Sequence, residues 1–247
     1  MNVYTIVNQK GGCGKTTTVL SLLSYYSFVG KRALAIDFDP QCSLTMLTKA
    51  GRDKTIMDVL ADDVPLADVV QKTSYGDVVA GSQELLSVES QLSGDNLVLL
   101  RKAVAKVSKL YDYVLIDCQP GLSSIPVSAM VACNGIIIPS TASLPVLYSI
   151  GQLGETVRFA KKRNPKLKIK GILLVMFNER LNVSKLMRET AEQVADKLGT
   201  KVFHTTIPKG VAVEEAYAMD KGLFQYAKNS RPAIAYKWFA RELEEGR

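Results

Sequence analysis

The sequence lacks the long apolar run of a membrane-spanning helix, because no stretch reaches the roughly 20 consecutive apolar residues that cross a bilayer. Its first residues, Met1-Asn2-Val3-Tyr4, lack the charged and apolar regions of a signal peptide, so we expect none. The four cysteines show no C-x-x-C pair, which argues against a disulfide framework or a zinc site and favours a reducing cytoplasm. The single histidine, His204, lies in a strand-like pattern, and we expect it to be structural.

Charge is distributed unevenly along the chain. Residues 1–150 carry 12 Lys and Arg against 13 Asp and Glu, whereas residues 151–247 carry 19 against 11, which accounts for the net charge of +7. Such an asymmetry indicates either a polyanion-binding face on the C-terminal part or a surface that only keeps the protein in solution. Composition alone favours the second interpretation.

Short apolar runs alternate with amphipathic stretches along the whole chain, as in a sheet whose strands are joined by helices. Several runs are apolar at every position, which is typical of strands buried on both faces of a parallel sheet. The expected strands are residues 3–8, 33–37, 78–80, 114–117, 135–139, 169–175 and 202–207. The expected helices are 17–28, 97–110, 151–163 and 184–198, with small peripheral helices in 49–75. The pattern predicts one doubly wound α/β domain over residues 1–247, with helices on both faces.

A glycine-rich loop follows the first expected strand and leads directly into a helix. This context suits phosphate binding, because glycines let successive N–H groups point at an anion and the helix N-terminus adds partial positive charge. Lys15 is placed to reach the β- and γ-phosphates, and Thr16 to offer its hydroxyl to Mg²⁺. The predicted nucleotide-binding residues of the loop are Lys10, Gly11, Gly12, Cys13, Gly14, Lys15, Thr16 and Thr17.

The loop departs from the usual pattern G-x-x-x-x-G-K-[ST] at its start. The first glycine of that pattern falls on Gln9, and a second lysine, Lys10, follows it. Lys10 stands too early in the loop to share the place of Lys15. It is therefore free to reach elsewhere, including across a dimer interface.

Carboxylates close two further expected strands. Asp37 and Asp39 follow the strand at 33–37, and Asp117 ends the strand at 114–117. Ligands bind at the carboxyl ends of strands in open α/β sheets. Asp117 is placed to hold Mg²⁺ directly or through water, and Asp39 to orient an attacking water molecule. One such residue alone is often a helix cap, but two beside a phosphate loop favour a functional site.

These motifs, in residues 10–17, 37–41 and 115–118, resemble those of the deviant Walker A ATPases, and within them the ParA/Soj DNA-segregation ATPases. Residues 171–176, 206–208, 215–216 and 230–231 extend the resemblance over essentially the whole chain. One departure is Gln119, which stands after Cys118 where the family usually has proline.

The resemblance implies an ATP- and Mg²⁺-dependent ATPase that forms a nucleotide-sandwich homodimer. Lys10 matches the signature lysine that contacts the phosphates bound by the other subunit, and Lys10, Lys15 and Asp39 are the implied catalytic residues. Asn178 and Pro208 match adenine contacts. The family also implies non-specific DNA binding on the nucleoid, stimulation by a ParB-like protein, and no membrane.

Basic residues of the C-terminal part are candidates for that DNA contact. Arg180 matches a position that ParA relatives use for DNA, and Lys209 lies near a position where relatives have a second arginine. A dense run of cations could join them on one surface, because phosphate contacts bind DNA without reading its sequence. The run comprises Lys161, Lys162, Arg163, Lys166, Lys168 and Lys170. A solvated helix end explains this run equally well.

Three other interpretations stay open. A MinD-like membrane or protein-cargo positioning switch needs a basic terminal amphipathic helix, but residues 232–245 carry Glu242, Glu244 and Glu245, so we expect that segment to pack on the domain with Trp238 and Phe239 in the core. An iron–sulfur carrier needs cysteines that share a cluster between subunits. A non-catalytic nucleotide sensor would need neither Asp39 nor Lys10.

Overall fold

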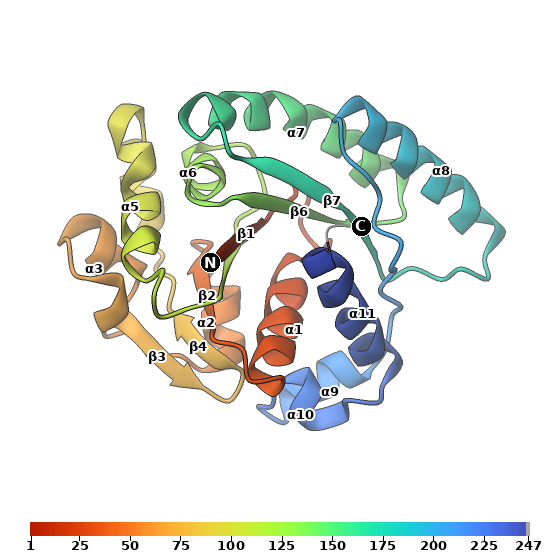
Figure 1. Ribbon diagram of the computed structural model, residues 1–247, viewed down its shortest axis with the longest axis horizontal. Coiled ribbons are helices and arrows are strands. Elements are labelled where there is room, and N and C mark those ends of the chain that lie inside the picture. The colour runs from red at the N-terminus through yellow and green to blue at the C-terminus, as the bar shows by residue number, and fades with distance from the viewer. Residues whose placement is uncertain (246–247) are drawn as a thin grey trace.

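The computed structural model describes residues 1–245, apart from the side chain of residue 182, and has a seven-stranded sheet at its centre (Figure 1). The strand order is β3-β4-β2-β5-β1-β6-β7, and neighbouring strands are parallel except β3 and β4. The strands are β1 (Asn2–Ile6), β2 (Ala33–Phe38), β3 (Val70–Thr73), β4 (Gly76–Val79), β5 (Tyr113–Cys118), β6 (Gly135–Thr141) and β7 (Lys168–Val175). The expected doubly wound, mostly parallel architecture is confirmed.

Helices cover both faces of this sheet. Figure 1 places α5, α6, α7 and α8 over one face, and α1 and α11 with α9 and α10 over the other. The helices are α1 (Lys15–Phe28), α2 (Ser43–Thr48), α3 (Ile56–Ala61), α4 (Leu85–Val88), α5 (Leu99–Lys106), α6 (Ser124–Ala132), α7 (Leu144–Arg163), α8 (Asn182–Lys197), α9 (Ala212–Ala218), α10 (Leu223–Ala227) and α11 (Arg231–Glu245). Two 3₁₀ turns, η1 (Leu66–Val69) and η2 (Gly94–Val98), precede β3 and α5.

Side chains of the central strands alternate between the two apolar layers. In β1, Val3 belongs to the layer under α5–α8, whereas Tyr4 and Ile6 belong to the layer under α1 and α11. In β2, Leu34 and Ala35 divide in the same way. Because successive side chains of a strand point to opposite faces, a strand buried on both sides must be apolar throughout, as these are.

The expected strand at 202–207 is wrong. The structure has only isolated bridges there, from Val202 to Ile172 and from Ile207 to Val175. Between these bridges, the backbone N–H groups of His204 and Thr205 donate to the carboxylate of Glu242 on α11, at 2.7 and 2.9 Å. Those two donors are therefore not available to a sheet ladder, and His204 is exposed rather than held in a strand.

The seventh strand is instead β3, which lies in the region where only small helices were expected. It pairs antiparallel with β4 through a tight turn at residues 74–75. The helix α3 and the turn η1 do form in this region. The expected helix at 151–163 is the second half of the longer α7, which passes through Gly154. A Cβ at Gly154 would lie 2.8 Å from Leu198, so this glycine lets α7 and the end of α8 approach closely.

The C-terminal helix α11 packs on the domain as expected, but only one of its two predicted core aromatics is buried. Phe239 is fully buried and meets Phe203 edge-to-face, with 4.9 Å between ring centroids. Trp238 is 53% exposed, which corrects the expectation that it lies in the core. Adjacent helix residues point about 100° apart, and the buried side of α11 passes through Phe239 and Ala240, which leaves Trp238 at its exposed border.

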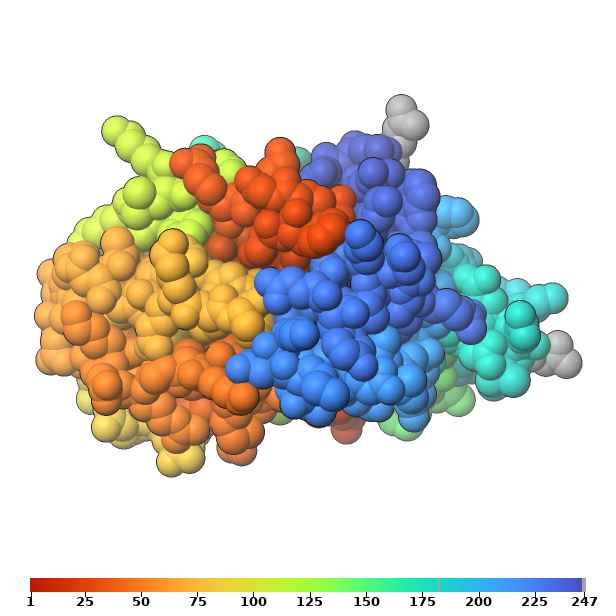
Figure 2. All heavy atoms as spheres, turned by 90° about the horizontal axis from the view of Figure 1, so that it is seen from below, coloured from red at the N-terminus to blue at the C-terminus, as the bar shows by residue number. Residues whose placement is uncertain are grey.

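The segments that precede α11 also rest on the N-terminal third of the chain. In the view from below, the blue segments that contain α9 and α10 lie against the orange segments of the N-terminal third (Figure 2). Asp220 forms an ion pair of 3.0 Å with Lys49 and accepts a hydrogen bond from Ser74. The backbone N–H of Phe224 donates to the hydroxyl of Ser24 on α1. These contacts fix α9–α11 beside the helix that begins at the glycine-rich loop.

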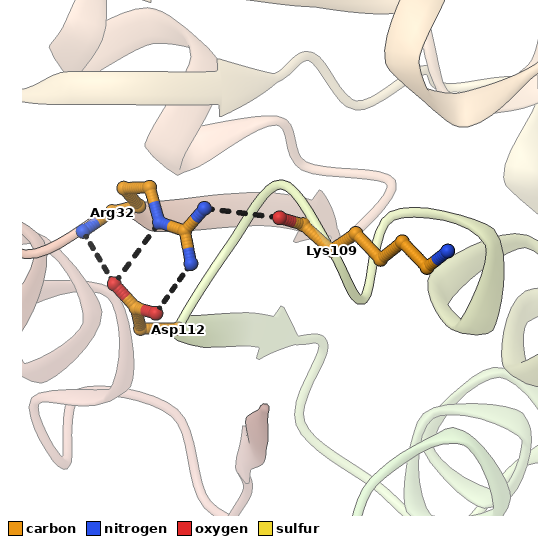
Figure 3. A network of polar contacts seen from close by, with 3 residues as sticks. All are labelled: Arg32, Lys109 and Asp112. Atoms are coloured by element: carbon orange, nitrogen blue, oxygen red, sulfur yellow. Dashed lines mark hydrogen bonds and ion pairs between the residues drawn. The ribbon is translucent and has the colours of Figure 1, made fainter.

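An ion pair joins the amino ends of β2 and β5 (Figure 3). The guanidinium of Arg32 donates to both carboxylate oxygens of Asp112, at 3.2 and 2.7 Å, and to the carbonyl oxygen of Lys109 at 2.9 Å. These hydrogen bonds lower the pKa of Asp112 to about 2, and Lys31 adds a smaller attraction. Both partners are exposed, so the pair fixes the local geometry more than it stabilises the fold.

We predict that Arg32→Ala raises the pKa of Asp112 from about 2 toward the ordinary value of about 3.9, because the charged form loses its main hydrogen-bond donors. Carboxyl chemical shifts followed through an acid titration measure this change. Lys31→Ala is the matched control, because it removes a neighbouring cation without a hydrogen bond. An unchanged Asp112 titration in Arg32→Ala would contradict the prediction. In the native protein, the stabilisation from this pair is present above about pH 4 and is lost as the pH falls toward 2.

Candidate nucleotide site

The glycine-rich loop connects the carboxyl end of β1 to the first residue of α1. Gly12 and Gly14 have φ values of 70° and 79°, in the left-handed region that only glycine adopts without strain. Gly14 is the N-cap residue of α1 and provides no side chain to its free N–H groups, and the first turn contains no acidic residue. The helix N-terminus therefore presents unpaired N–H groups and partial positive charge to an anion in the loop.

The two lysines of the loop have different settings. Lys15 is only 7% exposed, and its ammonium donates to the carbonyl oxygen of Lys10 at 3.1 Å. The thiol of Cys13 donates to the same carbonyl at 3.1 Å, while the backbone N–H of Lys10 donates to Asn8 at 3.2 Å. The backbone at Lys10 is therefore anchored on both sides, whereas its side chain is exposed. Lys15 faces the loop that the phosphates would occupy, and Lys10 faces outward.

Asp117 is the most strongly perturbed acid of the site. It is the penultimate residue of β5, where it pairs with Ile6 of β1 and Asp37 of β2, and it is almost completely buried. Neither carboxylate oxygen accepts a hydrogen bond of good geometry. Burial, reinforced by the nearby Asp37, raises the pKa of Asp117 well above its usual value, and the nearby Thr16 hydroxyl and Lys15 ammonium offset only part of this.

A buried carboxylate without a partner fits a divalent cation held together with the Thr16 hydroxyl. The described residues contain no group of three or more His, Cys, Asp or Glu side chains that could hold a metal by themselves. One carboxylate and one hydroxyl are the donor set expected for Mg²⁺, because this ion keeps several waters and takes most of its other ligands from substrate phosphates. Thr16 and Asp117, the latter through water, would hold the ion at this edge.

Asp37 and Asp39 are separated by one residue in the sequence but have different surroundings. Asp37 is fully buried and accepts from the backbone N–H and the hydroxyl of Thr45, at 2.8 and 2.6 Å. Burial raises its pKa to about 6. A Cβ at Gly81 would lie 2.9 Å from the carboxyl carbon of Asp37, so the segment that follows β4 leaves no space there. Asp37 therefore holds the start of α2, and sequence reasoning missed Thr45 and Gly81 because no spacing signals them.

Asp39 has the looser setting of the two. One carboxylate oxygen accepts the backbone N–H of Gln41 at 2.8 Å, and the side chain is 7% exposed. Burial raises its pKa, while the Gln41 N–H and the charge of Lys15 pull it down. Asp39 thus lies within electrostatic range of the phosphate-loop lysine and keeps an oxygen available for a water molecule.

The predicted adenine contacts come together beyond β7. Asn178 and Pro208 line one small cavity of about 180 Å³ together with Arg180, Lys209 and Arg231. Pro208 also lines a second cavity, of about 120 Å³, with Gly14 and Thr17 of the phosphate loop. The wall of this second cavity includes Tyr217, which sequence reasoning missed. An adenine base bound in these cavities would lie next to phosphates bound in the loop.

The predicted DNA-binding residues form two groups at opposite ends of β7. Arg180 and Lys209 are near the carboxyl end of β7, beside the phosphate loop. Lys161, Lys162, Arg163 and Lys166 lie at the end of α7 and in the turn that leads to the amino end of β7. The strand has eight residues, and at about 3.3 Å per residue it separates the two groups by roughly 23 Å. We call them the carboxyl-edge group (Arg180 and Lys209) and the amino-edge group (Lys161, Lys162, Arg163 and Lys166).

The cysteines do not form a shared surface cluster. Cys13, Cys42, Cys118 and Cys133 are all buried and free. A cluster bridging two subunits needs thiols at a subunit surface, so their burial disfavours the iron–sulfur interpretation. Among the described residues, no helix is both long and apolar enough to cross a bilayer.

Comparisons with known proteins agree with this geometry. A family model described as an AAA domain matches residues 1–169. The chain is 34% identical over 249 residues to the sporulation initiation inhibitor protein Soj of Bacillus subtilis (strain 168), covering 98% of this chain and 97% of Soj. It is 34% identical over 253 residues to the chromosome partitioning protein ParA of Caulobacter vibrioides, covering 98% and 94% of the two chains.

Solved structures share the fold. The structure of cobyrinic acid a,c-diamide synthase from Mycobacterium smegmatis with bound ATP analogue and magnesium superposes with a TM-score of 0.84 at 28% identity, covering 100% of this chain and 97% of the other. Its name differs from those of Soj and ParA, which illustrates that one fold carries several activities and that function must be argued from the site.

We predict that Asp117→Asn weakens the contribution of Mg²⁺ to nucleotide binding by about 10- to 100-fold, the usual effect of removing a group that acts through a metal-bound water. Titration calorimetry with a non-hydrolysable ATP analogue, with and without Mg²⁺, measures this. The apo variant should unfold at the same or a higher temperature, because asparagine is uncharged and replaces a buried carboxylate without a partner. Asp95→Asn, an exposed acid on η2, is the control. Unchanged Mg²⁺ dependence in Asp117→Asn would refute the assignment.

Proposed function

We propose a DNA-segregation function for this chain, which belongs to the AAA-domain family of P-loop ATPases that includes Soj and ParA. In this proposal, ATP with Mg²⁺ drives the formation of a homodimer that binds DNA without sequence specificity, and hydrolysis releases it. The observation that carries the proposal is the unpartnered, buried Asp117 beside a phosphate loop whose Lys15 is already in position. The near-complete coverage of both Soj and this chain supports the same activity for the whole protein.

The residues divide the work of hydrolysis. Lys15 and the N–H groups of the loop would bind the β- and γ-phosphates and stabilise the charge that develops on them. Mg²⁺, when bound, supplies further neutralisation of that charge. Asp39 would accept a hydrogen bond from the attacking water and orient it toward the γ-phosphate. Its proximity to Lys15 supports this role.

Lys10 is the residue we assign to the neighbouring subunit's nucleotide. Its carbonyl is occupied by Lys15 and Cys13, while its ammonium is exposed at the edge where a second subunit would face the site. A cation that approaches the phosphates from a partner subunit can contribute on the order of 10³–10⁵ in rate in related reactions. Loss of the γ-phosphate would weaken this attraction and release the dimer.

A MinD-like membrane switch is less well supported. Anionic lipid would repel the acids on α11, and these acids also hold the helix on the domain. Glu242 accepts two backbone N–H groups, and Glu244 accepts a hydrogen bond from the hydroxyl of Tyr113. Robust co-flotation with anionic liposomes in the presence of ATP would favour this alternative. The proposed setting is the nucleoid, and the proposed stimulating partner is a ParB-like protein. The presence of Asp39 and Lys10 favours a catalyst over a non-catalytic nucleotide sensor.

We predict opposite effects for two variants of the site. Lys15→Ala should abolish the ATP-dependent part of DNA binding, because the phosphates lose their main cation. Asp39→Ala should retain ATP-dependent binding but lower phosphate release by about 10²-fold or more, since the water is no longer oriented. DNA binding with ATP, ADP and no nucleotide, together with phosphate release, measures both.

Asp53→Ala, which replaces an exposed acid away from the site, is the control for the loss of a carboxylate. If Asp39→Ala hydrolysed ATP at the normal rate, the role given to Asp39 would be wrong. A wild-type protein that bound no DNA with any nucleotide would rule out the segregation function itself.

We also predict a difference between the two basic groups. The carboxyl-edge group adjoins the nucleotide, so Arg180→Glu should remove most nucleotide-dependent DNA binding. The triple variant Lys161→Glu, Lys162→Glu and Lys166→Glu should weaken binding but keep its dependence on ATP, because these residues act from the opposite edge. Affinity for a random duplex over a salt series measures both, and each lost phosphate contact should reduce the salt slope by about one. Loss of ATP dependence in the triple variant would contradict this division.

A further inference from the structure

A large open cavity extends from the predicted adenine contacts Asn178 and Pro208, which form part of its wall, toward the C-terminal helix. It has a volume of about 700 Å³ and lies between the loop after β7, the segment 204–208 and the first half of α11. Arg180, Arg231, His204 and Trp238 line it. Two guanidinium groups and an exposed indole thus line one cavity, and one of the guanidinium groups belongs to Arg180, which is already proposed to contact DNA.

The acids near this cavity are engaged in hydrogen bonds within the fold. Glu179 accepts the hydroxyl of Thr206 at 3.0 Å, and Glu242 accepts the backbone N–H groups of His204 and Thr205. Among the described residues, neither Arg180 nor Arg231 has an acidic side chain within ion-pair distance. The cations of the cavity are therefore available for an external anion.

The helix α11 presents one consistent face to this hollow. Arg231, Ile234 and Trp238 follow one another at spacings of three and four residues, which places them on the same side of the helix. The next turn adds Arg241, whose guanidinium lies 5.1 Å from the centre of the Trp238 ring. The opposite side of α11 carries buried residues such as Tyr236 and Phe239. We call Arg231, Trp238 and Arg241 the α11 stripe.

We propose that the α11 stripe is a DNA-contacting surface, in which Arg231 binds a backbone phosphate and Trp238 packs against the adjoining sugar. The inference rests on the proposed function and extends it to residues on a different element from Arg180. Planar guanidinium groups bind phosphate with two parallel hydrogen bonds, and an exposed aromatic beside them covers the apolar part of a nucleotide. An acidic protein segment would match the charges but would give the exposed indole less to cover.

Arg231 also connects this surface to the nucleotide. It lines both the large cavity and the small one, and the predicted adenine contacts Asn178 and Pro208 also line both. One side chain at the beginning of α11 therefore borders both the adenine pocket and the DNA surface. An adenine bound beside Asn178 and Pro208 would restrict the positions open to Arg231, and the nucleotide would thereby change the strength of the phosphate contact.

The fluorescence of Trp238 tests the proposal, because the chain contains one tryptophan. The full-length protein is first loaded with Mg²⁺ and a non-hydrolysable ATP analogue to set the baseline, and is then titrated with a 30-base-pair random duplex. We expect the emission of Trp238 to change as duplex is added and to level off when the protein is saturated. Arg231→Ala should weaken binding about tenfold and lower the salt slope by about one. Arg231→Lys should recover part of the affinity.

Lys237→Ala is the matched control, because it removes a cation from the same helix at a position that does not line the cavity. The proposal is overturned if the wild-type protein binds the duplex while Trp238 emission stays constant and Arg231→Ala behaves like Lys237→Ala. It is also overturned if poly-glutamate, but not the duplex, changes the emission, since the partner would then be an acidic protein. A wild-type protein that binds no duplex would refute the proposed function instead.

Discussion

The burial of Asp117 without a partner is the constraint on which the rest of the site depends. Parallel pairing of β1, β5 and β2 brings Ile6, Asp117 and Asp37 level with one another, so an acid is enclosed by its own sheet. A carboxylate in such a place is costly unless a cation or proton joins it. The fold therefore favours a positive charge beside Asp117. A Mg²⁺ ion would supply that charge, and phosphates bound in the loop would bring the ion there.

The loop is organised around a single backbone carbonyl. The oxygen of Lys10 receives both the ammonium of Lys15 and the thiol of Cys13, while Asn8 holds the N–H of the same residue. Asn8 is itself fixed by donating to the carbonyl of Pro139 on β6. Phosphates would have to displace the ammonium of Lys15 from this carbonyl or share it. The hydrogen bond from Lys15 to this carbonyl orders the loop, and bound phosphates would compete for the same ammonium group.

Local sequence patterns were sufficient to predict the buried strands of the sheet and the glycine-rich loop after β1. Both are marked by local signals, which are continuous apolar runs and glycine spacing. They failed where a distant group decides the outcome. Residues 202–207 read as a strand, but Glu242 of α11 takes two of their N–H groups. Thr45 and Gly81 complete the setting of Asp37 from other elements. Trp238 looked like a core residue because hydrophobicity does not reveal which side of α11 faces the sheet.

The same limit applies to charge, and here the geometry changes the interpretation. A list of basic residues suggests one continuous face, yet β7 separates the amino-edge group from the carboxyl-edge group. In a dimer that closes over two nucleotides, the carboxyl edges of the two sheets face each other and the amino edges point away. Only cations beside the carboxyl edge change their surroundings when the dimer forms. Under the proposed function, a nucleotide-controlled contact with DNA would therefore rest on Arg180 and its neighbours, and the remaining lysines would add only to the overall attraction.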